Sequence, residues 1–329
     1  MNPGMDILAG NASGMQASGS VAQRLLSSGM NVNALRTNDT LRKDEWITYD
    51  TTVVEIARER LGGVTDLVSA GLRYDLPNAM GTTKLEWERI TDMDPAEMSM
   101  SGVTAGRGDR QLFDLTSLPI PLIHKEFSIN IRTLMASRTT GQSLDTTQAA
   151  MATRLVTEKT EDLLFNGSNI IGTNNQIYGY TTAPARNTGV VTANWLTATG
   201  EQMLGDLLTM IDQAVQDNMY GPYMVYVPNG VYTHMGDDYK ANSDKTIMQR
   251  LKEVPGILDI KPSARITDST ILLIQFTSDV VDMVIGQQPT PISWDTNGGM
   301  TMNFKVISIM VPRIKDDLAS QSGIVHFSL

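Results

Sequence analysis

The chain has 329 residues, of which 41% are hydrophobic and 19% charged, with a formal net charge of −10 and no cysteine. This length allows a sizeable core in about two domains, and the composition excludes a disordered chain. The lack of cysteine excludes disulfides and thiolate metal sites. The acidic charge argues against binding nucleic acid through a basic face, because phosphate contacts need clustered Lys and Arg.

The N-terminal part predicts an arm and a short helix. Residues 1–45 are rich in Gly, Ser, Asn and Met, which is typical of a segment that orders only when it docks. The start has neither the basic residues nor the apolar centre of a signal peptide, and no apolar run approaches the roughly 20 residues of a membrane span. We therefore expect cytoplasmic synthesis and no membrane. Thr52 to Glu55 has the form of a capping box, so a helix is expected through Leu61, ending near Gly62.

Residues 82–90 have side chains of two kinds in alternation, as on the two faces of a strand. Leu85, Trp87 and Arg89 lie on one side of a predicted strand, opposite Lys84, Glu86 and Glu88. Residues 91–110 show no period, and 111–115 are expected to return as the partner strand. A two-stranded arm of this kind is marginally stable in water, so we expect a neighbouring subunit to hold it.

The stretch from Gln111 to Tyr180 begins with strand patterning to Arg132, in which Ile123, Phe127 and Ile129 share one face. Lys125 interrupts that face, which indicates a sheet edge or an interface. A polar turn then leads into a long helix over about 144–165, opened by Asp145-Thr146-Thr147-Gln148 and ended by Asn166-Gly167. Its predicted apolar stripe is Ala152, Leu155, Val156, Leu163 and Leu164, and its predicted wet side is Arg154, Glu158, Lys159, Glu161 and Asp162.

From Ile170 onward, helices alternate with short strands, which indicates an α/β layer arrangement. A capping box at Thr199 to Gln202 predicts a helix with one apolar face made by Leu204, Leu207, Leu208, Ile211 and Val215. Further elements are expected at 223–227 (strand), 244–252 (helix), 270–276 and 280–285 (strands). Strand character returns in the last 30 residues, first with Met302, Phe304 and Val306 on one face and finally at 323–329.

The sequence carries no recognisable catalytic motif, which predicts that the chain is not an enzyme and has no catalytic, cofactor or metal site. The three histidines are in separate segments, and His234 with Asp237 and Asp238 matches no zinc spacing. Phosphate-binding glycine motifs and a G-x-S-x-G elbow do not occur. Two rival hypotheses stay open at this point: a hydrolase using His234 and Asp237, and a monomeric adhesin acting through Arg107-Gly108-Asp109.

Two segments carry a resemblance to a known family. They are the run from Leu118 to Arg132 (LPIPLIHKEFSINIR) and the helix end Glu161-Asp-Leu-Leu-Phe-Asn-Gly167, followed by Ile177-Tyr-Gly-Tyr180. Together with the order of elements from about residue 45 to the C-terminus, they resemble tailed-phage major capsid proteins of the Hong Kong 97 fold, and they are also similar to encapsulin shell proteins.

The resemblance implies an α+β fold of the Hong Kong 97 type with a defined domain plan. The expected parts are an N-terminal arm (1–45), an N-terminal helix region (46–77), an extended loop (78–114), a peripheral domain with a long spine helix (115–169 and 296–329) and an axial domain (170–295).

The resemblance also implies a function as a virion capsid protein of a bacteriophage, assembled in the host cytoplasm. Copies would self-assemble as hexamers and pentamers of an icosahedral shell enclosing double-stranded DNA without sequence-specific binding, and portal, scaffold or decoration proteins are further candidate partners. The alternative is an encapsulin-type compartment that holds a cargo enzyme. The expected intersubunit contacts on the extended loop are Lys84, Trp87, Arg89, Arg107 and Arg110.

Overall fold

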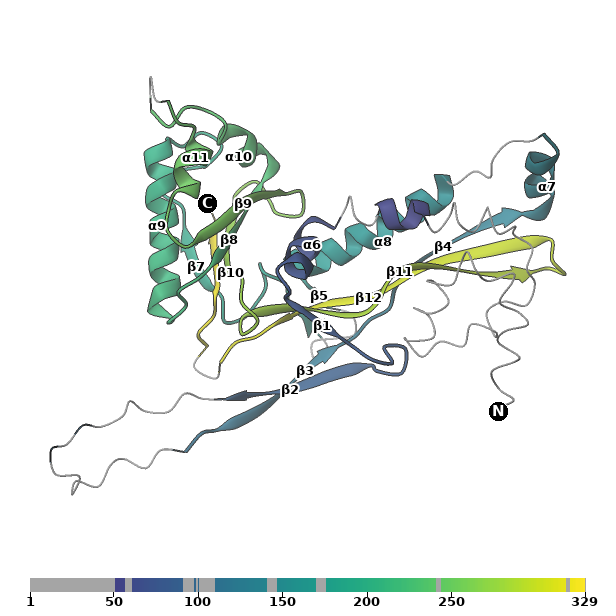
Figure 1. Cartoon of the computed structure of the whole chain (residues 1–329), viewed down its shortest axis with the longest axis horizontal. Helices are drawn as coiled ribbons and strands as arrows, with labels where there is room; N and C mark the ends of the chain where they lie inside the picture. Colours follow the sequence, from purple (N-terminus) through teal and green to yellow (C-terminus); the bar gives the residue numbers. More distant parts are fainter. Residues whose placement is uncertain are drawn as a thin grey trace, which may run out of the picture. The chain divides into compact units, whose positions relative to one another are not determined.

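The computed structural model describes residues 51–56, 61–90, 98, 100, 110–140, 147–169, 176–240, 244–317 and 320–328. The chain divides into two compact units (Figure 1). The first comprises Met1–Thr83, Ile120–Phe165 and Asp282–Pro312, and the second comprises Lys84–Pro119, Asn166–Val281 and Arg313–Leu329. The predicted N-terminal arm and the segment containing Arg107 fall outside the described residues.

The first unit contains a four-stranded sheet in the order β1-β11-β12-β4. Its strands are β1 (Arg73–Asp75), β11 (Val281–Thr296), β12 (Thr301–Ile314) and β4 (Ile123–Asn130). The edge strand β4 pairs antiparallel with β12, and this register stacks the rings of Phe127 and Phe304 with centroids 5.1 Å apart. The predicted strand face and edge position are confirmed, since Ile123, Phe127 and Ile129 are partly buried and Lys125 is exposed.

The helices of the first unit differ from the prediction near their ends. Residues 51–56 are helical, with Thr52 inside the helix, but α6 (Gly62–Ser69) begins at Gly62, where the sequence predicted an end. Helix α7 (Ile131–Thr140) lies where a polar turn was expected, because its weakly amphipathic sequence gives no clear period. Helix α8 (Thr147–Asn166) is the predicted spine helix. No helix in the described ranges has both the length and the hydropathy needed to cross a bilayer.

The buried face of α8 is more polar than the predicted stripe. Thr153, Thr157 and Thr160 have no exposed surface, and their hydroxyls donate to carbonyls four residues earlier at 2.8 to 3.0 Å. These internal bonds satisfy each hydroxyl, so threonine is buried here without an external partner. Leu155, which was predicted on the apolar stripe, is 42% exposed. Glu161, which was predicted on the wet side, is buried. Both predictions were wrong.

Glu161 is buried because it caps α6. Its Oε1 accepts a hydrogen bond from the backbone N–H of Gly63 at 2.7 Å, and Oε2 accepts one from Val64 at 3.4 Å. A carboxylate at a helix N-terminus is stabilised both by the free N–H groups and by the helix dipole. A Cβ on Gly63 would lie 3.0 Å from Leu164 Cδ2, so glycine permits this close approach of α6 to α8.

The second unit contains a five-stranded sheet in the order β7-β13-β10-β8-β9. Its strands are β7 (Asn187–Val190), β13 (Ile324–Ser328), β10 (Thr270–Gln275), β8 (Tyr223–Pro228) and β9 (Ile257–Ser263). The strands predicted at 223–227, 270–276 and 323–329 are confirmed, whereas β7 and β9 were missed. Every residue of β8 and β10 is buried, as expected for central strands covered on both faces.

Three helices pack on one face of this sheet: α9 (Gly200–Gln216), α10 (Asn229–His234) and α11 (Ile247–Lys252). The capping box predicted for α9 is confirmed, with Thr199 and Gln202 exchanging side-chain and backbone bonds. The predicted apolar face is only partly correct. Met203, Leu207, Met210 and Ala214 face the core, while Leu208 is 49% exposed and Val215 39%.

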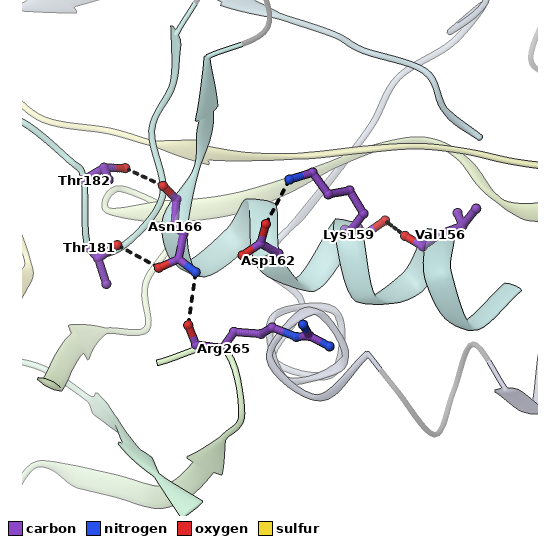
Figure 2. A network of polar contacts seen from close by, with 8 residues as sticks. Val156, Lys159, Asp162, Asn166, Thr181, Thr182 and Arg265 are labelled. Atoms are coloured by element: carbon purple, nitrogen blue, oxygen red, sulfur yellow. Dashed lines mark hydrogen bonds and ion pairs between the residues drawn. The ribbon is translucent and has the colours of Figure 1, made fainter. Parts of the chain in front are cut away.

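The predicted Asn-Gly end of α8 is confirmed, and Asn166 joins three segments of the second unit (Figure 2). Its Nδ2 donates to the Arg265 carbonyl at 3.0 Å, and its Oδ1 and backbone carbonyl accept from Thr181 and Thr182, each at 3.2 Å. Gly167 has φ +68°, and a Cβ there would lie 2.3 Å from the Ile177 carbonyl oxygen. Glycine is therefore required where β5 (Ser168–Asn169) pairs with β6 (Gln176–Ile177).

Candidate functional site

The main candidate site is a two-stranded ribbon made by β2 (Lys84–Ile90) and β3 (Phe113–Pro119). The strands pair antiparallel from Lys84 opposite Pro119 to Ile90 opposite Phe113, which confirms the predicted hairpin and extends its second strand. Burial along β2 alternates strictly, with Leu85, Trp87 and Arg89 partly buried. Opposite residues in an antiparallel pair point to the same face, so the ribbon has two distinct faces.

The face that carries Arg89 is bound within the same chain. Arg89 Nη2 donates to Asp114 Oδ2 at 2.6 Å, across the ribbon, and Arg89 Nη1 donates to Asp316 Oδ2 at 3.1 Å. The Arg89 and Asp316 side chains are 25% and 16% exposed. The hydrogen bond to Asp114 is the main cause that raises the pKa of the Arg89 guanidinium.

The pKa of Asp316 is governed by burial more than by its ion pair with Arg89. Burial raises the pKa of Asp316, although the charge of Arg89 acts in the opposite direction. Its neighbour Asp317 adds a smaller like-charge effect in the same direction as burial. The loss of hydration therefore has a larger effect on this pKa than the attraction of the Arg89 charge.

Trp87 lies on the same face as Arg89 and contacts a second cation. The guanidinium carbon of Arg313, near the end of β12, is 5.7 Å from the centre of a Trp87 ring. This distance is within the range of a cation–π interaction. Trp87 and Arg89 of β2 are thus held by one residue near the end of β12, Arg313, and one just after it, Asp316.

The opposite face of the ribbon is apolar and exposed at its far end. Ile90, Phe113 and Leu115 are 44%, 60% and 62% exposed. Ile90 and Phe113 are directly opposite, and Leu115 is opposite Glu88. We call Ile90, Phe113 and Leu115 the outer ribbon patch. Exposed apolar residues that cluster in this way mark interaction sites.

The five predicted contact residues do not form one cluster. Trp87 and Arg89 share the inner face, whereas Lys84 is on the outer face at the base of the ribbon. Arg110 is exposed just before β3, and Arg107 lies outside the described residues.

The residues of this site that were missed from the sequence include Phe113, Leu115 and Asp316. Phe113 and Leu115 carried a signal, since they alternate with Asp114 in a segment that was predicted as a strand. Asp316 carried none, because it is 227 residues from Arg89 in the chain.

Two histidines, His234 and His326, are the alternative candidates for chemistry. His234 Nδ1 is 2.9 Å from Asp237 Oδ2, and its Nε2 is 3.0 Å from the Ala198 carbonyl oxygen, at the end of α10. His326 Nδ1 accepts from Arg186 Nε at 3.1 Å, and burial lowers the pKa of this imidazole, with Arg186 adding to the effect. Across the described ranges, no group of three or more His, Asp or Glu side chains is arranged to hold a metal ion.

Comparison with solved structures identifies the fold. A virus-like particle from Pyrococcus furiosus aligns over 85% of this chain and 99% of its own, with 20% sequence identity and a TM-score of 0.60. The capsid of Myoviridae Phage XM1 aligns over 75% of this chain and 86% of its own, with 11% identity and a TM-score of 0.61. Among curated proteins, the type 1 encapsulin shell protein EncA of Myxococcus xanthus is 25% identical over 225 residues, which are 67% of this chain and 68% of that protein.

The chain therefore has the Hong Kong 97-type fold that phage capsid proteins and encapsulin-like shells share, as the sequence resemblance implied. By sequence, it belongs to the family described as "Family of unknown function (DUF6260)", whose model matches residues 33–327.

Proposed function

We propose that this chain is the major capsid protein of a tailed bacteriophage. Copies of it form hexamers and pentamers of an icosahedral shell that encloses double-stranded DNA. The observation that carries the proposal is the β2–β3 ribbon, whose inner face is bound within the chain while its outer face presents an apolar patch to solvent.

A ribbon of two strands is marginal by itself in water, and exposing Phe113 and Leu115 adds an unfavourable hydration cost. A second copy that covers the outer ribbon patch removes that cost. Each such contact is modest, but closure of a shell repeats it for every subunit, as multivalency multiplies weak affinities.

The five predicted contact residues have two different roles in this proposal. Trp87 and Arg89 fix the direction of the ribbon through Arg313, Asp114 and Asp316. Lys84 and Arg110 are exposed and pair with acidic rims of the neighbour, and Arg107 is assigned the same role from its sequence position.

The acidic charge suits a container for DNA. A net charge of −10 gives an inner wall no general affinity for phosphates, so a motor can pack DNA and the shell can release it. Portal, scaffold and decoration proteins are candidate partners, and the site of assembly is the host cytoplasm.

The proposal starts from the domain plan expected from the resemblance: arm 1–45, helix region 46–77, extended loop 78–114, peripheral domain 115–169 with 296–329, and axial domain 170–295. It departs from that plan where β11 joins the sheet of the first unit and β13 that of the second. The ribbon forms the base of the extended loop, and α8 is the spine of the peripheral domain.

A second candidate is the shell of an encapsulin-type compartment that holds a cargo enzyme. The 25% identity to an encapsulin shell protein favours it, since the phage capsid shares only 11% with this chain. The 45-residue N-terminal segment favours the capsid, because it offers a region for scaffold binding or maturation.

The contents of native particles distinguish the two candidates. Particles purified from the cells that carry the gene are treated with nuclease, imaged by electron microscopy and assayed for DNA and co-purifying protein. The capsid proposal predicts nuclease-resistant double-stranded DNA inside tailed particles. Tail-less particles that contain one abundant enzyme and no DNA would support the compartment instead.

A further inference from the structure

The sequence contains three asparagines that directly precede a glycine: Asn166, Asn229 and Asn297. In such a step the backbone nitrogen of the glycine can attack the carbonyl carbon of the asparagine side chain, because glycine has no side chain to hinder the approach. The three steps share this chemistry. A difference in their reactivity must therefore come from the fold.

The attack needs a backbone geometry that regular structure does not supply. The nitrogen and the side-chain carbon have to meet in a five-membered ring, and the rate depends on how often that arrangement is reached. A helix or a closed turn holds the two atoms apart, so each step must first open locally. The free energy of that opening differs between exposed turns and buried elements.

Asn297 lies in the turn between β11 and β12 (Figure 1). Asn297 and Gly298 are exposed, with φ of +57° and +65°, and a Cβ on Gly298 would meet nothing within 4 Å. The Asn297 carbonyl accepts from the Met300 N–H at 3.3 Å, and its Nδ2 donates to Thr301 Oγ1 at 3.2 Å. Both hydrogen bonds are long, so little resists the opening of this turn.

Asn166 is held more firmly (Figure 2). Its Nδ2 donates to the Arg265 carbonyl at 3.0 Å, and its Oδ1 accepts from Thr181 at 3.2 Å. Gly167 is buried, and a Cβ there would lie 2.3 Å from the Ile177 carbonyl oxygen. Opening this step would disrupt the packed end of α8 as well as both bonds of the amide.

Asn229 is exposed like Asn297, but it belongs to a helix. Asn229 and Gly230 are the first two residues of α10, and the Asn229 carbonyl accepts from Thr233 Oγ1 at 3.1 Å. A Cβ on Gly230 would lie 2.9 Å from Leu196 Cδ2, so this glycine packs against another segment. Opening here would unwind the start of α10.

We propose that Asn297 is a site of spontaneous covalent modification, at which the side-chain amide is lost. The Gly298 nitrogen gives up its proton and bonds to Asn297 Cγ, and the amide nitrogen leaves as ammonia. Water then opens the resulting succinimide at one of its two carbonyls, which gives aspartate or isoaspartate. One water is consumed and one ammonia is released, without an oxidant or a second protein. The inference does not depend on the proposed shell function.

The modification changes the turn in two ways. Both products have a carboxylate in place of the neutral amide, which adds a negative charge two residues from Asp295. Isoaspartate also routes the main chain through Cβ, which lengthens the connection between β11 and β12. This happens in a turn where Asn297, Gly298 and Gly299 all have positive φ.

Peptide mapping of the unmodified chain by mass spectrometry tests the site, with Asn166 and Asn229 as internal controls. One sample is kept folded in a mildly alkaline buffer, and a matched sample is kept unfolded in guanidinium chloride. The rate of amide loss is measured for each asparagine in both samples. We expect folding to slow Asn297 least, and to leave Asn297 at least about tenfold faster than Asn166 in the folded chain.

Two results would overturn the proposal. One is a folded chain in which Asn166 or Asn229 loses its amide as fast as Asn297. The other is a folded chain that keeps the Asn297 amide intact while the unfolded chain loses it. Either result leaves the proposed shell function unaffected, because the measurement does not involve assembly.

Thr301 is a positioning residue in this proposal, since its hydroxyl holds the Asn297 amide. Thr301→Ala is expected to speed the amide loss at Asn297 by about twofold to tenfold, the range for the loss of one hydrogen bond. The rate at Asn166 should not change, and Thr301→Ser, which keeps a hydroxyl, should match the parent. Circular dichroism checks that both variants fold. An unchanged rate at Asn297 in Thr301→Ala would show that this bond does not restrain the amide.

Discussion

Arg89 of β2 and Asp316, just beyond the end of β12, are 227 residues apart in the sequence and form an ion pair of 3.1 Å. The same guanidinium bonds Asp114 across the ribbon at 2.6 Å. This pair ties the ribbon, near the end of β2, to the segment that follows β12. The direction of the ribbon therefore depends on a few charged atoms.

Replacing Arg89 by alanine is expected to destabilise the second unit. The change leaves Asp316, which is 16% exposed, without its guanidinium, at a cost of about 1–3 kcal/mol. Urea unfolding followed by circular dichroism measures the difference. The exposed Lys84→Ala on the same strand is the control, with an expected change within about 0.5 kcal/mol. Equal stability of both variants and the parent would mean that the ion pair contributes nothing.

Asp316→Asn is expected to change the pH dependence of unfolding. Burial raises the folded pKa of Asp316 above its unfolded value, so the folded state binds the proton more tightly. Its contribution to stability is then fully present below the unfolded pKa, near 3.9, and is lost as the pH rises through the raised folded pKa. The parent should therefore lose stability relative to the variant as the pH rises above about 4. A difference that stays constant over this range argues against the raised pKa.

Asp206 is expected to be the most sensitive carboxylate of α9. It is 3% exposed and accepts from the Trp195 Nε1 at 2.8 Å and from the backbone N–H of Thr192 at 3.1 Å. Asp206→Ala leaves these two donors and the Thr192 hydroxyl, which also donates to Asp206, unpaired, which predicts a loss of about 3 kcal/mol in the free energy of unfolding. The exposed Asp212→Ala on the same helix is expected to change it by about 0.5 kcal/mol or less. If the two variants lose equal stability, the buried hydrogen bonds of Asp206 do not account for the loss.

A substitution at Leu115 tests whether the outer ribbon patch forms a contact between copies. Leu115→Asp places a charge on a side chain that is 62% exposed, so the isolated subunit should fold normally. Burial of a leucine contributes about 1.5–3 kcal/mol, so each contact between copies should weaken by about tenfold or more. Light scattering during assembly measures this, with Leu115→Met as an apolar control of similar volume. Normal assembly of Leu115→Asp would remove the patch from the proposed interface.

The elements that the sequence predicted best are those with a strict period or a complete local signal. The alternation of Leu85, Trp87 and Arg89 gave β2, and Thr199 with Gln202 gave the start of α9. Asn166-Gly167 gave the end of α8, because only a local left-handed turn was needed. Such features depend on neighbours within a few residues.

The features that were missed depend on distant partners. Glu161 was assigned to the wet side of α8 because its partners, the N–H groups of Gly63 and Val64, are almost 100 residues away. Buried threonines on the same helix mimic a polar face, although each hydroxyl bonds its own helix. Likewise, β9 contains Asp259 and Pro262, which an edge strand tolerates but which obscured its period.

Electron microscopy of the purified, unmodified chain, supported by light scattering over a range of concentration and ionic strength, tests the central claim most directly. Closed particles of uniform diameter with icosahedral symmetry are expected. A chain that stays monomeric under every condition, with no particles in the images, would contradict it.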